Sequence, residues 1–288
     1  MKESLVEKIG IFLLRKGFTV KTLNRTAFDI VARRDTTILL IKILFDANAV
    51  SEEFTKSMHN VAAYVGGSPL IIADKAGDKL EDNVVYLRFG IFTLNFRTLC
   101  NSIDSKLPFA IRDHSGVNAH LIGTKLRKVR EEEGISLNDL ARKVGVSKSM
   151  VQKYEAGESR ISINKALRLY QLLGHSLFEK IDIFGHDKNI MPVGKGDISR
   201  KFSDMGFSAT EAEKVPFDII AKKEKELILT KVGDGQQQGL DSLSKLVDAD
   251  RLAIYLKKKP KNVPAMTKKE FMEFEKAEEL IKFLKEFE

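Results

Sequence analysis

The sequence lacks the features that mark secreted, membrane-spanning and zinc-binding proteins. Cys100 is the only cysteine among 288 residues, so the chain can form no internal disulfide and no cysteine-rich zinc site. The longest apolar run, residues 38–45, contains Lys42 and is far shorter than the roughly 18 residues that span a bilayer. Glu3 and Glu7 interrupt the apolar stretch that a signal peptide needs. We therefore expect a cytoplasmic protein without a membrane partner.

Histidine is also scarce, and its placement gives no sign of a metal site. None of the histidines has metal-ligand spacing, so we expect neither a metal nor another cofactor. The five histidines are His59, His114, His120, His175 and His186.

The composition is that of a globular protein, with 43% hydrophobic and 31% charged residues, and the length allows two or three cores. The net charge of +8 is unevenly distributed. Residues 120–176 hold 11 Lys and Arg against 6 Asp and Glu, whereas residues 177–288 hold 21 of each. Basic charge concentrated on one small segment is what a polyphosphate partner requires. Charge alone leaves open a solvated surface of mixed sign.

Residues 1–112 have helix and strand patterns in α/β order. Leu5, Ile9 and Leu13 share one helical face, and a turn is expected near residues 35–37. The predicted elements are a helix ending at Gly17, a hairpin of residues 27–32 and 38–45, a helix at 51–65, and strands at 70–73 and 84–87.

The hairpin pattern occurs twice. Residues 28–43 align with residues 217–232 without a gap, and six of the sixteen pairs are identical. Any two amphipathic hairpins share an apolar pattern, but that pattern does not explain why a charged pair recurs at equal separation. The recurring residues are Asp29 and Lys42 in the first stretch and Asp218 and Lys231 in the second. We infer a duplicated domain.

The second copy is predicted at residues 198–288. Its last element is a helix that begins with capping-box spacing at Thr267 and Glu270. The apolar residues assigned to that single helix are Phe271, Phe274, Leu280, Ile281 and Leu284.

The segment between the copies is a predicted domain of residues 113–184, in which about residues 113–180 are predicted to be entirely helical, and residues 185–197 are a predicted linker. Ser136 and Ser147 have the position of N-caps, and Gly145 suits the tight turn between two helices because it has no Cβ. The predicted helices are residues 123–133, 137–144, 148–155 and 162–173. This arrangement is a helix-turn-helix whose third helix can enter the major groove of DNA.

Two sets of polar side chains are expected to contact double-stranded DNA. Gln and Lys can hydrogen-bond adenine and guanine, whereas cations near the phosphates give affinity but little sequence information. The predicted base-reading residues are Ser147, Lys148, Ser149, Gln152 and Lys153. The predicted phosphate-binding residues are Arg127, Lys128, Arg142, Lys143 and Arg160.

This stretch resembles the Cro/C1-type helix-turn-helix family, also called the xenobiotic-response-element family. The matching segments are residues 122–127, 135–141, 145–149 and 154–157, within roughly 55 residues of the chain. One position departs from the family, because Leu137 stands where members commonly have a Gln that contacts a phosphate or supports the base-reading residues. A helical bundle that has lost DNA binding is the alternative.

The flanking copies resemble the PD-(D/E)xK nuclease core of restriction enzymes and Holliday-junction resolvases. That core has an Asp on one strand and an acidic-x-Lys triplet on the next, and the two carboxylates hold a divalent cation. Both copies have Leu at the second acidic position, at Leu40 and Leu229, so neither copy is expected to cleave DNA or to bind a metal. Asp29, Lys42, Asp218 and Lys231 are then vestigial nuclease positions, or simply structural ion pairs.

The resulting prediction is α/β plus all-α: two restriction-endonuclease-like α/β domains, residues 1–112 and 198–288, flank a central helical Cro/C1-type domain. This layout resembles a group of uncharacterised archaeal regulators and indicates a sequence-specific, non-enzymatic transcription regulator. The flanking domains could dimerise, contact the DNA backbone or sense a ligand. We favour a homodimer, because the C-terminal segment is charge-neutral and ends in an apolar-faced helix.

Two other classes of function remain open. One is an active or residual nuclease or repair protein that the helix-turn-helix directs to DNA. The other is an adaptor of the multiprotein-bridging type, which would connect the transcription machinery to a DNA-bound activator.

Overall fold

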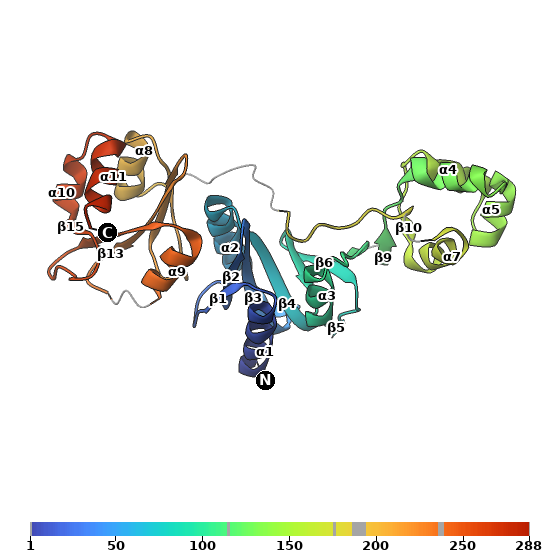
Figure 1. Cartoon of the computed structure of the whole chain (residues 1–288), viewed down its shortest axis with the longest axis horizontal. Helices are drawn as coiled ribbons and strands as arrows, with labels where there is room; N and C mark the ends of the chain where they lie inside the picture. Colours follow the sequence, from blue (N-terminus) through green and yellow to red (C-terminus); the bar gives the residue numbers. More distant parts are fainter. Residues whose placement is uncertain (1, 114–115, 175–176, 186–193, 236–238, 288) are drawn as a thin grey trace. The chain divides into compact units, whose positions relative to one another are not determined.

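The computed structural model describes residues 2–113, 116–174, 177–185, 194–235 and 239–287 (Figure 1). The chain forms two compact units. The first consists of Met1–Phe45, Ala49–Ile71 and Phe184–Glu288, and the second of Asp46–Asn48 and Ile72–Ile183. Among the described residues, no helix combines the length and apolarity that a bilayer crossing demands. His114, His175, His186 and most of the predicted linker lie outside the described residues.

The N-terminal part of the first unit is an antiparallel sheet covered by helices. Ile9 and Leu13 face the sheet without exposure, which confirms the predicted apolar face of the first helix. The second helix begins after the N-cap Ser51 and ends at Gly66, whose φ of 67° suits glycine. The elements are α1 (Lys2–Arg15), β1 (Thr19–Thr22), β2 (Ile30–Arg34), β3 (Thr37–Asp46) and α2 (Glu52–Val65).

The C-terminal part of the first unit is a five-stranded sheet of order β11-β12-β13-β14-β15, in which β13 pairs parallel with β14 and β14 with β15. Phe202 and Phe271 meet in its core, with ring centroids 4.9 Å apart. Its elements are α8 (Asp197–Asp204), β11 (Ser208–Glu211), β12 (Ile219–Lys223), β13 (Glu226–Val232), α9 (Leu240–Val247), β14 (Asp250–Tyr255), β15 (Ala265–Thr267), α10 (Lys268–Glu273) and α11 (Ala277–Lys285).

The prediction of one terminal helix is wrong, although the capping box at Thr267 and Glu270 is confirmed. The chain leaves helical geometry at Phe274, with ψ of 129°, and a second helix begins at Ala277. Phe271 and Leu284 are both buried in one core. In a single helix they would lie about 20 Å apart along the axis, so the break lets both reach that core.

The duplicated hairpins have the same backbone arrangement. Thr19 pairs with Arg33 in the first, and Ser208 pairs with Lys222 in the second, so each position has a counterpart 189 residues later. The turn residue Asp35 and its counterpart Glu224 both have φ of 53°, in the left-handed region. Identical register together with identical turn geometry is more than a shared apolar pattern requires.

The second unit contains the remaining elements. Strand β4 (Ser68–Ala76) begins in the first unit and ends in the second. Strand order in the second unit includes β7-β6-β8-β9-β10, and β5 pairs with β4. The elements after β4 are β5 (Asp78–Lys79), β6 (Val84–Arg88), β7 (Ile91–Leu94), α3 (Phe96–Ile103), β8 (Ala110–Asp113), β9 (Gly116–Ala119), α4 (Gly123–Glu132), α5 (Leu137–Val144), α6 (Lys148–Glu155), β10 (Ile161–Ser162) and α7 (Ile163–Leu173).

The prediction that about residues 113–180 are entirely helical is also wrong. Strands β9 and β10 pair antiparallel, with Ala119 opposite Ile161. Both residues are buried in the same core as the surrounding helices. The two strands therefore join the segment before α4 to the segment between α6 and α7, and β10 leads directly into α7.

Candidate nucleic-acid interface

Four helices of the second unit, α4 to α7, form the predicted helix-turn-helix around one apolar core. Leu126, Leu140, Val144, Val151 and Leu169 are among its buried residues. The bounds of α5 and α6 agree with the sequence prediction, and those of α4 and α7 agree within one residue. Local capping explains this agreement for α5 and α6, whose first turns are each capped by a serine side chain.

The caps that were predicted from the sequence are present. The hydroxyl of Ser136 accepts a hydrogen bond from the backbone N–H of Asp139 at 3.1 Å, and Ser147 accepts one from Met150 at 3.2 Å. Gly145 closes α5 with φ of 79°, and its N–H donates to the carbonyl of Ala141. The turn between α5 and α6 is therefore specified by short-range hydrogen bonds and one glycine.

Helix α6 is fixed at its C-terminal end by α4. The Arg130 guanidinium donates two hydrogen bonds to the Glu155 carboxylate, at 2.5 and 3.2 Å, and both side chains are largely buried. These hydrogen bonds raise the pKa of Arg130 above its ordinary value. A Cβ on Gly123 would lie 2.3 Å from the Glu155 carbonyl oxygen, so only glycine fits where α4 begins.

The outer face of α6 is exposed. Val151 and Tyr154 anchor the inner face and are 1% and 3% exposed. The polar residues predicted to read bases are all exposed: Ser147, Lys148, Ser149, Gln152 and Lys153. A short helix with a rigid inner face and an exposed polar outer face can present side chains to the edges of base pairs.

The cations predicted to bind phosphates are also exposed, and several form surface ion pairs on their own helices. Arg127 lies 3.1 Å from Glu131, Lys128 lies 3.7 Å from Glu132, and Arg142 lies 2.6 Å from Asp139. Exposed pairs of this kind contribute little to stability, so a phosphate can replace the carboxylate at small cost. Lys143 and Arg160 are exposed as well.

Sequence reasoning missed the roles of two basic residues. Arg130 belongs to the buried pair with Glu155, 25 residues away. Arg168 donates a hydrogen bond to the Val144 carbonyl at 3.3 Å, at the C-terminal end of α5. No pattern in the sequence separates these structural cations from those on the surface, because each depends on a partner from another helix.

The nuclease-like Asp–Lys pair of the first copy is buried and satisfied within the protein. One oxygen of Asp29 accepts the backbone N–H of Ile43 at 2.8 Å, and the other lies 3.5 Å from the Lys42 ammonium. Lys42 also donates to the Thr26 carbonyl at 2.8 Å and lies over the Phe54 ring. The pair therefore ties β3 to the residue that immediately precedes β2.

The second copy repeats this pair with more exposure. Lys231 lies 3.0 Å from Asp218, whose other oxygen accepts the Val232 N–H at 2.6 Å. The side chains of Asp218 and Lys231 are 39% and 20% exposed, against 8% and 10% for Asp29 and Lys42. Helix α2 places Phe54 over Lys42, and no aromatic contact to Lys231 is recorded among the described residues.

The positions that lack a second carboxylate are apolar core positions. Leu40 and Leu229 are both completely buried. A cavity of about 750 Å³ next to Asp29 is lined by further polar residues, among them Glu3, Glu7 and Arg25. Within the described ranges, no three His, Cys, Asp or Glu side chains are arranged to hold a metal ion.

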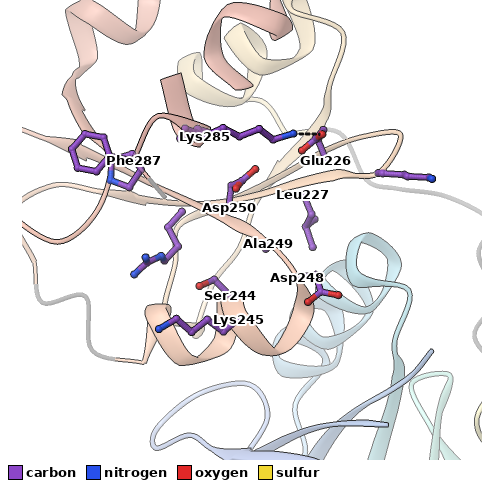
Figure 2. Close-up of a pocket in the computed structure, with 13 residues that line it drawn as sticks. Glu226, Leu227, Ser244, Lys245, Asp248, Ala249, Asp250, Lys285 and Phe287 are labelled. Carbon is purple, nitrogen blue, oxygen red and sulfur yellow. Dashed lines mark hydrogen bonds and ion pairs between the residues drawn. The ribbon is translucent and has the colours of Figure 1, made fainter. Parts of the chain in front are cut away.

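Another cavity, of about 660 Å³, lies between α9, β14 and the end of α11 (Figure 2). Figure 2 shows the Lys285 ammonium directed at Glu226, and the two lie 2.9 Å apart. Asp248 at its rim pairs with Arg33 at 2.5 Å. Because these charges already have partners within the protein, the cavity does not indicate a class of ligand.

Two families of known proteins match parts of the chain. The family described as a PD-(D/E)XK superfamily domain matches residues 2–108, and the family described as helix-turn-helix matches residues 126–179. The helix-turn-helix resemblance is thereby confirmed, and the nuclease-like resemblance is confirmed for the N-terminal copy.

Relatives of similar length match most of this chain. A protein of Methanosarcina mazei is 30% identical over 256 residues, which cover 81% of this chain and 78% of its own. Proteins of Methanosarcina acetivorans and Thermococcus kodakarensis are 29% and 28% identical, and each match covers at least 95% of both chains. All three bear the name "Putative HTH-type transcriptional regulatory protein".

Proposed function

Because this chain belongs to the archaeal family of HTH-type transcriptional regulatory proteins that those relatives represent, we propose that it is a sequence-specific DNA-binding transcription regulator. Helix α6 enters the major groove, where Gln152 bonds an adenine and Lys148 or Lys153 bonds a guanine. The surrounding cations bind phosphates. The observation that carries the proposal is the exposed polar face of α6 on a helix that Arg130, Glu155 and Gly123 hold rigidly.

The proposed domains are residues 1–112, 113–184 and 198–288, with a linker at 185–197. The last is a second nuclease-like domain, because its hairpin has the register and turn geometry of the first. Two chains act together on a two-fold symmetric site, since one recognition helix of eight residues contacts few base pairs. The partners are double-stranded DNA and a second copy of the chain.

The flanking domains are proposed to be non-catalytic. Each Asp oxygen of both copies serves a backbone N–H or a Lys, and the place of the second carboxylate is taken by a buried Leu. One carboxylate already engaged in the fold is a poor ligand for Mg²⁺.

The test is selection of bound duplexes from random DNA with the full chain, followed by incubation of the selected DNA with Mg²⁺ or Mn²⁺. We expect enrichment of a symmetric motif and no cleavage. Cleaved product would favour the nuclease function, and binding without an enriched motif would favour an adaptor that depends on other proteins for its position.

A further inference from the structure

The two copies of the hairpin domain contact each other within the first unit, and the contacts are reciprocal. The Arg33 guanidinium on β2 donates to the Leu246 carbonyl in the last turn of α9, at 3.1 Å. Its counterpart Lys222 on β12 donates to the Tyr64 carbonyl in the last turn of α2, at 2.8 Å. Leu246 and Tyr64 each lie two residues before the C-cap of their helix.

Both contacts have the same physical basis. The last carbonyls of a helix have no partner within it and carry the negative end of its dipole, so a cation from a neighbouring strand satisfies them. In each case the strand comes from one copy and the helix from the other. When residue i of one domain contacts j of a second, and the equivalent of i contacts the equivalent of j, the two domains are related by a two-fold axis.

The contact between the loops before β2 and β12 shows where that axis lies. Ala27 donates its N–H to the Lys214 carbonyl at 2.6 Å. Lys214 is the counterpart of Arg25, and both have left-handed φ, at 55° and 58°. A loop that touches its own counterpart lies on the axis. The reciprocal hydrogen bond is missing for a chemical reason, because the counterpart of Ala27 is Pro216, which has no N–H.

Contacts off the axis extend the interface. The Ser57 hydroxyl on α2 donates to the Glu213 carbonyl at 2.6 Å. The Lys214 ammonium lies 3.0 Å from the Glu53 carboxylate and 4.1 Å from the centre of the Phe54 ring. Together they join α2 of the first copy to the β11–β12 loop of the second.

We propose that the two copies form a closed dimer inside one chain, and that the partner which fits this face is the other copy of the same domain. The face is therefore occupied and does not pair two chains. A homodimer on DNA has to use another surface, which replaces the chain-pairing role that the sequence suggested for these domains. The proposal depends only on contacts in the first unit, so it stands or falls independently of DNA binding.

Carbodiimide cross-linking tests it, because the reagent joins a Lys amine to a carboxylate without a spacer. A mixture of unlabelled and ¹⁵N-labelled full-length protein is cross-linked, digested and analysed by mass spectrometry. We expect a Lys214–Glu53 peptide in which both halves carry the same isotope. The Lys285–Glu226 pair, within the C-terminal domain, is the positive control, and Lys214→Arg should abolish only the Lys214–Glu53 product.

Mixed-isotope Lys214–Glu53 peptides would overturn the proposal, since they would place the partner copy in a second chain. The proposal would also be overturned if no Lys214–Glu53 product formed while the Lys285–Glu226 product did. A second variant probes the reciprocal contacts: Arg33→Glu with Lys222→Glu should reduce the Lys214–Glu53 yield several-fold. Lys225→Glu, on the exposed turn beside β12, should leave the yield unchanged.

Discussion

Helix α6 and the β2–β3 hairpin both carry closely spaced polar side chains, but α6 exposes these side chains and the hairpin buries them. Helix α6 leaves Ser149 and Gln152 exposed beside a buried inner face, whereas the hairpin encloses Asp29 and Lys42 and uses both for internal bonds. A polar group that the fold has already satisfied has little left to offer a ligand. This difference supports the proposal that α6 recognises DNA, and it predicts that the Asp29–Lys42 pair contributes to stability.

The two hairpin copies differ in how deeply their Asp–Lys pair is buried. The Asp of each copy accepts a backbone N–H at the equivalent position, Ile43 or Val232, yet Asp218 is 39% exposed and Asp29 is 8% exposed. In the second copy, Glu211 accepts backbone N–H groups of Lys195 and Gly196 and the hydroxyl of Ser199. Burial raises the pKa of Glu211, but these hydrogen bonds outweigh it and leave the pKa below its usual value.

The largest expected effect is loss of stability when the buried pair is broken. Asp29→Ala leaves Lys42 buried without its carboxylate and should lower the free energy of unfolding by about 3–5 kcal/mol. The matched variant Asp218→Ala should cost about 1 kcal/mol or less, because solvent screens the exposed pair. Urea unfolding followed by circular dichroism compares the two. Equal losses would show that burial does not distinguish the copies.

A smaller effect is expected where α4 meets α6. Gly123→Ala puts a Cβ 2.3 Å from one backbone carbonyl oxygen and 2.6 Å from another, so the helices must shift at a cost of about 1–3 kcal/mol. Gly10→Ala on α1 is the control, since its Cβ meets nothing within 4 Å. The midpoint temperature of thermal unfolding and the DNA affinity should both fall for Gly123→Ala and not for Gly10→Ala. Unchanged DNA affinity would mean that the position of α6 is not critical.

The smallest effect concerns the phosphate contacts. Lys143→Ala should weaken binding to all duplexes equally and flatten the dependence of log K on log salt by about 0.9. Lys225→Ala, an exposed lysine far along the chain in the C-terminal copy, should change neither quantity. Fluorescence anisotropy at several salt concentrations measures both. A change of base preference in Lys143→Ala would contradict a role limited to the DNA backbone.

The helix-turn-helix could be predicted from the sequence almost residue by residue, because its boundaries depend on local signals such as Ser136, Gly145 and Ser147. Strands β9 and β10 could not, since the pairing of Ala119 with Ile161 joins residues far apart in the chain. Strands β1 and β7 and helix α3 were not predicted from the sequence either, because they depend on distant pairing or lack a long apolar pattern.

The candidate site was predictable in part. The exposed set on α6 followed from helical spacing, but the buried Arg130–Glu155 pair depends on the packing of two helices. The recurrence of Asp29 and Lys42 as Asp218 and Lys231 was readable as a repeat. Whether each pair would be buried or exposed depended on α2, whose Phe54 covers Lys42.

The most direct test of the assignment to α6 is selection from random DNA with the natural chain and with Gln152→Ala in parallel. We predict that both enrich the same motif except at one base pair in each half-site, where the variant loses about 1–3 kcal/mol of discrimination while its unfolding is unchanged. An identical motif with undiminished preference at every position would contradict base reading by α6.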